Sequence, residues 1–115
     1  MLTLELPYPP SVNHIYQYTR CGVFLKAEVK AYRFVVRSII RSLRTQPVRG
    51  RLRVEVDLYP PDRRKRDIDN TLKSLFDSLM HAGVIEDDSC IDVLLVTRRE
   101  RMSGGKVIVS IQEIS

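Results

Sequence analysis

Two kinds of charged side chain follow one another between Pro60 and Lys73, and together they suit the cutting or joining of a phosphodiester bond. Cations at high density attract phosphates, whereas carboxylates held close together attract a divalent metal ion. A site that needs both is typical of phosphodiester chemistry. Four consecutive cations precede two carboxylates that are two residues apart, in the order Arg63, Arg64, Lys65, Arg66, Asp67, Ile68 and Asp69.

The triplet from Asp67 to Asp69 is predicted to be extended, so that both carboxylates project to one side while Ile68 points into the core. Asp69 then caps the helix that follows, and Lys73 lies one turn further on the same face. Two close carboxylates repel each other unless a cation neutralises them, and their hard oxygens favour Mg²⁺ or Mn²⁺ over zinc. The triplet alone is also compatible with a helix cap beside a solvated basic loop, so its neighbours decide the interpretation.

A third metal ligand is expected from the acidic loop Glu86-Asp87-Asp88-Ser89, which follows the same helix and is the only other dense carboxylate cluster. This loop completes the site if it comes round to the sheet edge that holds Asp67. The segment after the loop adds a further carboxylate, Asp92. The sequence leaves open whether Asp87, Asp88 or Asp92 is the ligand.

The composition predicts one soluble domain covering residues 1–115, with 43% hydrophobic and 29% charged residues. A net charge of +5 favours a polyanionic partner such as nucleic acid. Cys21 and Cys90 fit no metal-ligand spacing, so we expect two reduced thiols in a cytoplasmic protein. No segment resembles a signal peptide or reaches membrane-spanning length, and we expect no membrane contact.

Hydrophobic periodicity predicts the elements that must position these residues. Alternation predicts strands at 2–6, 52–58 and 107–111, and an apolar run predicts a central strand, covered on both faces, at 91–97. A proline-rich loop and a hairpin are predicted at 7–15 and 16–25, and helices at 26–44 and from about 70 to Gly83, which suits a C-cap. This order predicts an α+β fold: a two-layer mixed β-sheet with two helices packed on one face.

The polar faces of the two predicted helices carry charge. Asp69, Lys73 and Asp77 are predicted to share the polar face of the shorter helix. The longer helix has four arginines beside its apolar face, which favour a solvated surface over a phosphate-binding stripe. These arginines are Arg33, Arg37, Arg41 and Arg44.

In combination, these motifs closely resemble the RusA family of Holliday junction resolvases. The resemblance covers essentially the whole chain and implies a RusA-like fold. It also implies a homodimeric, Mg²⁺-dependent endodeoxyribonuclease that places paired nicks across four-way DNA junctions in recombination and repair. The residues that carry the resemblance are the run from Asp62 to Asn70, then Lys73, Asp77, Gly83, Asp87-Asp88 and Ile91, and an opening motif from Tyr8 to Asn13 with Tyr16.

The resemblance also implies a role for each residue of the site. Catalysis falls on Asp67, Asp69, Lys73 and Asp88, and the three aspartates among them hold Mg²⁺, with Mn²⁺ able to substitute. Asn13 and the four cations contact DNA, the cations by clamping its backbone; these cations are Arg63, Arg64, Lys65 and Arg66. The expected location is the cytoplasm, in association with the nucleoid.

Two other functions fit part of the same pattern. A non-catalytic DNA- or RNA-binding module needs the basic run and has no use for the acids. A metal-dependent nuclease of other branched or linear DNA needs both. Mg²⁺-dependent cleavage of a four-way junction separates these alternatives, and the absence of a glycine-rich nucleotide loop argues against a nucleotidyltransferase.

Overall fold

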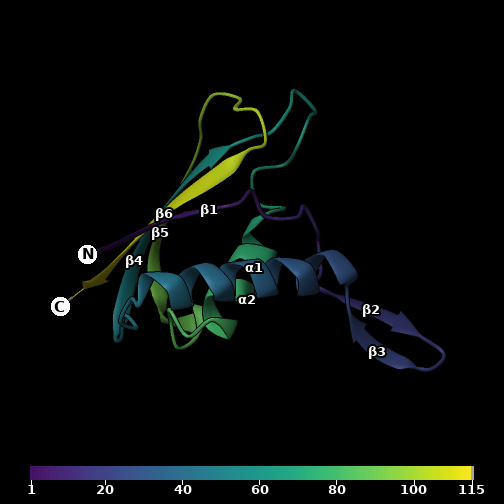
Figure 1. Cartoon of the computed structure of the whole chain (residues 1–115), viewed down its shortest axis with the longest axis horizontal. Helices are drawn as coiled ribbons and strands as arrows, with labels where there is room; N and C mark the ends of the chain where they lie inside the picture. The colour runs from purple at the N-terminus through teal and green to yellow at the C-terminus, as the bar shows by residue number, and fades with distance from the viewer. Residues whose placement is uncertain (115) are drawn as a thin grey trace.

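Apolar and polar residues alternate along most of the strands, and four of these strands form one sheet in the computed structural model, which describes residues 1–114 (Figure 1). The spatial order is β1-β6-β4-β5. β6 pairs antiparallel with β1 and with β4, whereas β4 and β5 are parallel, so the sheet is mixed as predicted. The elements are β1 (Leu2–Leu6), β2 (Tyr16–Thr19), β3 (Gly22–Leu25), α1 (Ala27–Leu43), β4 (Arg51–Tyr59), α2 (Leu72–His81), the 3₁₀ helix η1 (Asp88–Cys90), β5 (Ile91–Arg98) and β6 (Lys106–Ile114).

The core lies between the sheet and the two helices, which cover the same face of the sheet (Figure 1). Every second residue of β4 points into this core and is at most 1% exposed, and α1 and α2 bury one stripe each against it. The predicted α+β architecture is therefore confirmed. The buried apolar residues of these elements are Leu52, Val54, Val56 and Leu58 of β4, Val29, Tyr32, Val36 and Ile40 of α1, and Leu75 and Leu79 of α2.

The predicted end of the second helix is confirmed as well. α2 ends at His81, and Gly83 follows it with a φ of 79°, a left-handed conformation that glycine adopts without strain. Cys21 and Cys90 are free thiols. Among residues 1–114, no helix combines the length and apolar character needed to cross a bilayer.

Strand β5 differs from the prediction of a central strand covered on both faces. It lies at the edge of the sheet and pairs only with β4 among residues 1–114. Val93, Leu94 and Leu95 are consequently 39%, 42% and 51% exposed. The prediction was wrong because an apolar run indicates that a strand carries apolar surface, but not which element covers that surface.

The parallel connection from β4 through α2 to β5 fixes the layout of the site. The chain leaves β4 at Tyr59, passes through α2, and begins β5 beside the start of β4, with Ile91 opposite Leu52. Segments before and after α2 therefore lie at opposite ends of a ten-residue helix, whose length is about 15 Å.

The hairpin of β2 and β3 forms a separate sheet and projects away from the body of the molecule, as Figure 1 shows. This confirms the hairpin predicted over residues 16–25. Its side chains are mostly exposed, among them Tyr18 at 77% and Phe24 at 49%. The hairpin therefore contributes little to the core.

A buried ion pair joins the two helices and corrects the prediction for Asp77. Asp77 is only 7% exposed and faces α1 instead of the solvent. Arg33 donates from Nε and Nη2 to the two carboxylate oxygens of Asp77, both at 2.7 Å, and this hydrogen bonding raises the pKa of Arg33. The first arginine of the stripe on α1 is therefore structural, whereas Arg37, Arg41 and Arg44 are exposed.

We predict that Arg33→Met lowers the free energy of unfolding by about 2–3 kcal/mol, because it leaves a buried carboxylate without its partner. The measurement is the urea midpoint at a fixed m-value. Arg41→Met is the matched control, since Arg41 lies on the same helix and makes no ion pair within residues 1–114. Equal midpoints for the two variants would contradict the prediction.

Candidate active site

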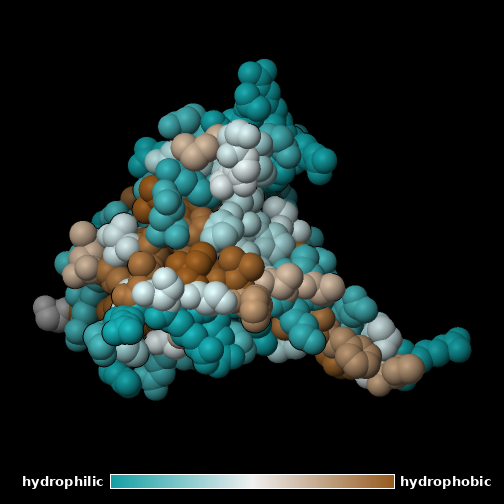
Figure 2. Space-filling view, in the orientation of Figure 1, coloured by the Kyte–Doolittle hydropathy of each residue, from teal (hydrophilic) through white to brown (hydrophobic). Residues whose placement is uncertain are grey.

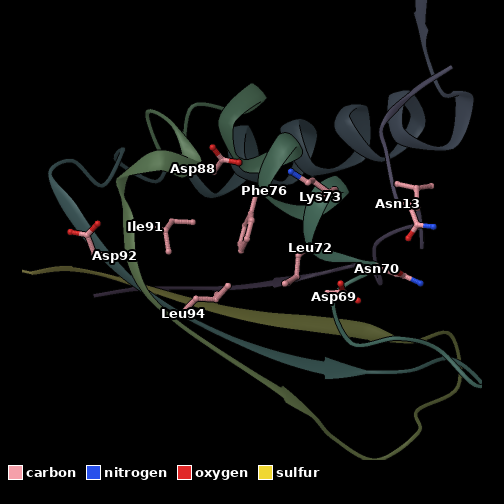
Figure 3. A pocket seen from close by; sticks show the side chains of 11 residues that line it. Asn13, Asp69, Asn70, Leu72, Lys73, Phe76, Asp88, Ile91, Asp92 and Leu94 are labelled. Carbon is pink, nitrogen blue, oxygen red and sulfur yellow. The ribbon is translucent and has the colours of Figure 1, made fainter. Parts of the chain in front are cut away.

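A pocket of about 430 Å³ lies between α2, the start of β5 and the proline-rich loop (Figure 3). Its wall combines acids, one lysine and amides with apolar side chains, so the charged groups lie beside apolar surface. The polar residues that line it are Asn13, Asp69, Asn70, Lys73, Asp88 and Asp92, and the apolar ones are Val12, Leu72, Phe76, Ile91 and Leu94.

Three of the four residues predicted to be catalytic share this pocket. Asp69 and Asp88 lie at its opposite ends, and Lys73 comes from the turn of α2 between them (Figure 3). The separation follows from the parallel connection, since Asp69 precedes α2 and Asp88 follows it. The pocket is therefore elongated along α2.

The backbone around Asp67 and Asp69 is folded into turns and not extended as predicted. Asn70 N donates to Asp67 O at 3.2 Å, and Leu72 N donates to Asp69 O at 3.1 Å. These bonds remove the alternation on which the prediction depended, and Ile68 is 39% exposed instead of pointing into the core. The N-cap of α2 is Thr71 and makes no side-chain capping bond, so the prediction that Asp69 caps the helix was also wrong.

Asp67 lines a second pocket of about 580 Å³, together with part of the basic run and the proline-rich loop. Asn70 lines both pockets, so the two are adjacent. Asp67 therefore lies beside the first pocket and not within it. The cations that share the second pocket with Asp67 are Arg64, Lys65 and Arg66.

The oxygen donors of the site suit a hard cation such as Mg²⁺ in chemical type. Their spacing does not complete a site within one chain, because no group of three Asp, Glu, His or Cys side chains among residues 1–114 gathers closely enough to hold a metal ion. The assignment of Asp67, Asp69 and Asp88 as metal ligands stays a prediction.

The acidic residues after α2 have different surroundings. Ser89 donates from Oγ to Asp87 at 2.6 Å, which lowers the pKa of Asp87, and Asp87 does not line the first pocket. Asp92 lines the pocket but is paired with Arg51. The carboxylate of Asp88 makes no ion pair within residues 1–114. Of these three acids, Asp88 is the one whose oxygens are free to bind a ligand at the pocket.

The proline-rich loop is attached by two hydrogen bonds to the helices and by a third to the turn before α2. Tyr32 Oη donates to Pro7 O and Ser74 Oγ donates to Pro10 O, each at 2.7 Å. Val12 N donates to Asn70 O at 2.9 Å. Burial of the Tyr32 ring raises the pKa of its hydroxyl, which keeps this donor protonated. These contacts place Asn13 at the pocket, and sequence periodicity contains no signal for them.

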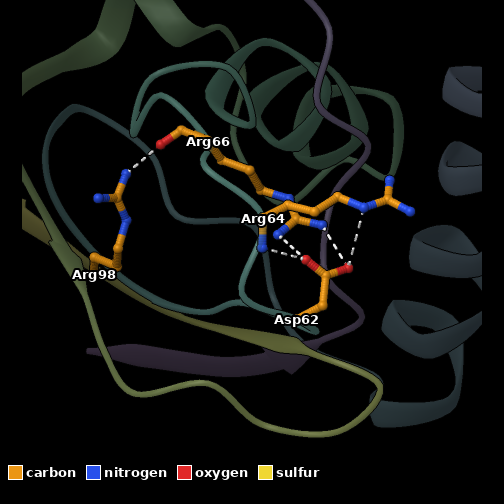
Figure 4. Close-up of polar contacts among 4 residues, drawn as sticks. All are labelled: Asp62, Arg64, Arg66 and Arg98. Atoms are coloured by element: carbon orange, nitrogen blue, oxygen red, sulfur yellow. Dashed lines mark hydrogen bonds and ion pairs between the residues drawn. The ribbon is translucent and has the colours of Figure 1, made fainter.

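Asp62 organises the basic run (Figure 4). Arg66 donates to both carboxylate oxygens of Asp62, at 2.7 and 3.0 Å, and Arg64 N donates to the same carboxylate at 2.9 Å. The hydrogen bonds from Arg66 lower the pKa of Asp62 to about 2. Arg66 also lies 5.8 Å from the centre of the Tyr8 ring. The contacts of Arg66 therefore hold the conformation of the loop. Its contact with phosphate stays a prediction.

The turn between β5 and β6 adds cations that were overlooked in the sequence. Arg98 donates from Nη2 to Arg66 O at 2.6 Å (Figure 4), and Met102 N donates to Pro60 O at 2.9 Å. The signal was present as a second arginine-rich run at 98–101, but only the fold brings it beside the first. We define the basic patch as Arg63, Arg64, Lys65, Arg98 and Arg101, which line one pocket of about 250 Å³.

Comparison with known proteins identifies the family. The family model described as "Endodeoxyribonuclease RusA" matches residues 7–112. The chain belongs to the RusA family. It is 40% identical to the crossover junction endodeoxyribonuclease rusA of Enterobacteria phage HK97, over 95% of this chain and 92% of that protein. It is 34% identical to the protein of that name from Enterobacteria phage 82, over 96% and 93%.

The bacterial relatives agree with the phage proteins. The crossover junction endodeoxyribonuclease RusA of Escherichia coli (strain K12) is 33% identical over 97% of this chain and 94% of its own length. The resemblance drawn from the sequence is therefore confirmed. Membership of the RusA family makes the chain an endodeoxyribonuclease, and the acidic pocket and the basic patch belong to an enzyme that acts on DNA.

We predict that Asp62→Ala makes the loop from Pro60 to Arg66 more sensitive to trypsin, by about tenfold in cleavage rate. The substitution removes the two carboxylate oxygens that accept hydrogen bonds from the Arg66 guanidinium, and with them the acceptor of Arg64 N. Proteases cut most readily where a loop opens. Limited proteolysis read by mass spectrometry gives the rate at each bond. Glu55→Ala, which removes an exposed pair with Arg53, is the control. Unchanged cleavage after Arg63 to Arg66 would show that Asp62 does not hold the loop.

Proposed function

We propose that this RusA-family endodeoxyribonuclease resolves four-way DNA junctions by paired, symmetric nicks, with Mg²⁺ as its cofactor. The crossover junction endodeoxyribonucleases to which the chain is 33–40% identical support this substrate. The observation that carries the proposal is the shared pocket of Asp69, Lys73 and Asp88, beside a second pocket that holds Asp67 and part of the basic run. A catalytic role explains the acidic residues, which a DNA-binding module without catalysis would not need.

The residues of the two pockets have separate tasks in this proposal. Asp67, Asp69 and Asp88 are the residues that would supply oxygen ligands to Mg²⁺, although they do not gather into one site among residues 1–114. The bound ion would supply a water of lowered pKa and neutralise charge in the transition state. Lys73 places its ammonium group at the reacting phosphate, where it stabilises the charge that builds up on the oxygens. The basic patch binds the phosphates on either side.

The enzyme acts as a homodimer in this proposal, because a four-way junction offers two scissile strands related by a two-fold axis. Edge strand β5 supports a protein contact, since it combines unpaired backbone groups with two exposed apolar side chains outside the active-site pocket, Val93 and Leu95. Exposed edges of this kind readily pair with another chain. The site of action is branched DNA of the nucleoid during recombination and repair.

We expect Asp69→Asn to keep junction binding and to lower the rate of Mg²⁺-dependent nicking at least 100-fold, because the amide is a poor ligand for a hard cation. The measurement uses a labelled four-way junction, with binding by gel shift and cleavage by denaturing gel. A matching linear duplex tests the alternative substrate. Full nicking by this variant would overturn the assignment of Asp69.

Asp87→Asn is the matched control for Asp88→Asn. The two acids are adjacent, but only Asp88 lines the pocket. Asp88→Asn should abolish nicking, whereas Asp87→Asn should retain it within about threefold. Loss of nicking with Asp87→Asn alone would move the third ligand to Asp87.

We expect Lys65→Ala to weaken junction binding by a similar factor for junctions of different sequence, because contacts with the DNA backbone carry no sequence information. The slope of log Kd against log salt should fall by about one, as one fewer counterion is released. Fluorescence anisotropy at several salt concentrations measures both quantities. An unchanged slope would remove Lys65 from the phosphate contacts.

A further inference from the structure

A separate cleft, distinct from the two pockets of the active site, lies between the hairpin, the outer surface of α1 and the end of α2. It encloses about 500 Å³. Lys30, Phe34 and Arg37 of α1 reach it together, because residues three and four apart share one face of a helix. Phe24 of the hairpin and His81 of α2 form its other sides.

Two phenylalanine rings of this cleft are exposed and do not pack in the hydrophobic core. Phe34 is 73% exposed and Phe24 is 49% exposed. α1 packs on the sheet through a different stripe, which includes Val29 and Val36. Figure 2 shows apolar residues along the projecting hairpin and across the middle of the same face of the molecule. The two rings are therefore available to a ligand.

The charge of the cleft has one sign. Lys30 and Arg37 are exposed, and neither makes an ion pair within residues 1–114. Arg33 also lines the cleft but is already neutralised by Asp77, and no acidic side chain lines it. Aromatic rings combined with unpaired cations are the features that proteins use for unpaired nucleotides: the bases stack on the rings and the cations neutralise the phosphates.

We propose that this cleft binds an unpaired nucleotide of the branched DNA substrate, with its base stacked on Phe34 or Phe24 and its phosphate bound by Lys30 and Arg37. The inference rests on the proposed function, because a branch point is where duplex DNA can release an unpaired base. His81 at the cleft and Lys73 at the active site lie on the same helix. Eight residues of helix separate them, a rise of about 12 Å. This rise is less than one turn of duplex DNA, so a branched DNA molecule is large enough to span both positions.

The test measures binding of a fluorescein-labelled 12-nucleotide oligothymidylate in EDTA, so that no cleavage intervenes. Phe34→Ala should weaken binding about tenfold, and Phe34→Leu nearly as much, because leucine keeps apolar bulk but offers no ring for stacking. Arg37→Ala should lower the salt slope by about 0.7, the value for one phosphate of a single strand. A 2-aminopurine base in the oligonucleotide should be quenched by the wild-type protein and less so by Phe34→Ala.

Tyr18→Ala is the matched control, since Tyr18 is an exposed aromatic residue of the hairpin that does not line the cleft. It should bind as the wild type does. Equal losses for Tyr18→Ala and Phe34→Ala, or no loss for Phe34→Ala, would overturn the proposal. So would a change of sedimentation coefficient in Phe34→Ala with unchanged DNA binding, which would make the cleft a protein contact.

The same variants separate this inference from the proposed function. Suppose that the wild-type protein binds the oligonucleotide through Phe34 but does not nick a four-way junction with Mg²⁺. This result would support nucleotide binding in the cleft and contradict the resolvase function. A Phe34→Ala variant that nicks junctions and binds the oligonucleotide as the wild type does would support the resolvase function and contradict nucleotide binding in the cleft.

Discussion

The parallel pairing of β4 with β5 is the constraint on which the site depends. Two parallel neighbours need a long crossover, and here α2 supplies it. The crossover places the carboxylate that precedes the helix and the one that follows it at opposite ends of α2. The fold thus spreads its acids along a pocket that follows α2.

A second constraint joins loops that are far apart in the sequence. The proline-rich loop is attached to α2 through Ser74, and the basic loop is attached to the end of β5 through Arg98 and to the β5–β6 turn through Met102. Gly105 closes this arrangement, because a Cβ at this position would lie 3.0 Å from side-chain atoms of Pro61 and Tyr8. Its φ of 68° is also one that glycine tolerates. Three loops therefore meet with little free space between them.

Much of this was predictable from the sequence, because local chemistry determines it. Both helices, the hairpin, the mixed sheet and the left-handed Gly83 follow from periodicity and turn preferences, and the family follows from the motif that contains Asp67 and Asp69. The burial of Asp77 was not predictable, because its partner Arg33 is 44 residues away. Placement of β5 at an edge likewise depends on how the strands are ordered in space, about which its apolar run gives no information.

The site shows the same division between local and distant information. Sequence spacing indicated Asp69 and Lys73, and the family resemblance added Asp88; these three residues do share a pocket. It failed for the conformation between Asp67 and Leu72, where backbone turns replace the extended segment. It also gave Arg66 only the role of a phosphate contact, whereas the structure pairs Arg66 with Asp62. Hydrogen bonds of this kind depend on the folded backbone, so hydrophobic patterns do not report them.

The separate hairpin of β2 and β3 has a consequence for how such an enzyme diversifies. Among residues 1–114 the hairpin forms a sheet only with itself, and Lys26 N donates to Ile15 O where the hairpin joins the body. Its length and sequence can therefore change with little cost to the core. If Phe24 contacts DNA as proposed above, insertions and substitutions there would alter DNA binding, while the acids along α2 keep their positions. On that proposal, DNA binding through the hairpin can change with little effect on the stability of the fold.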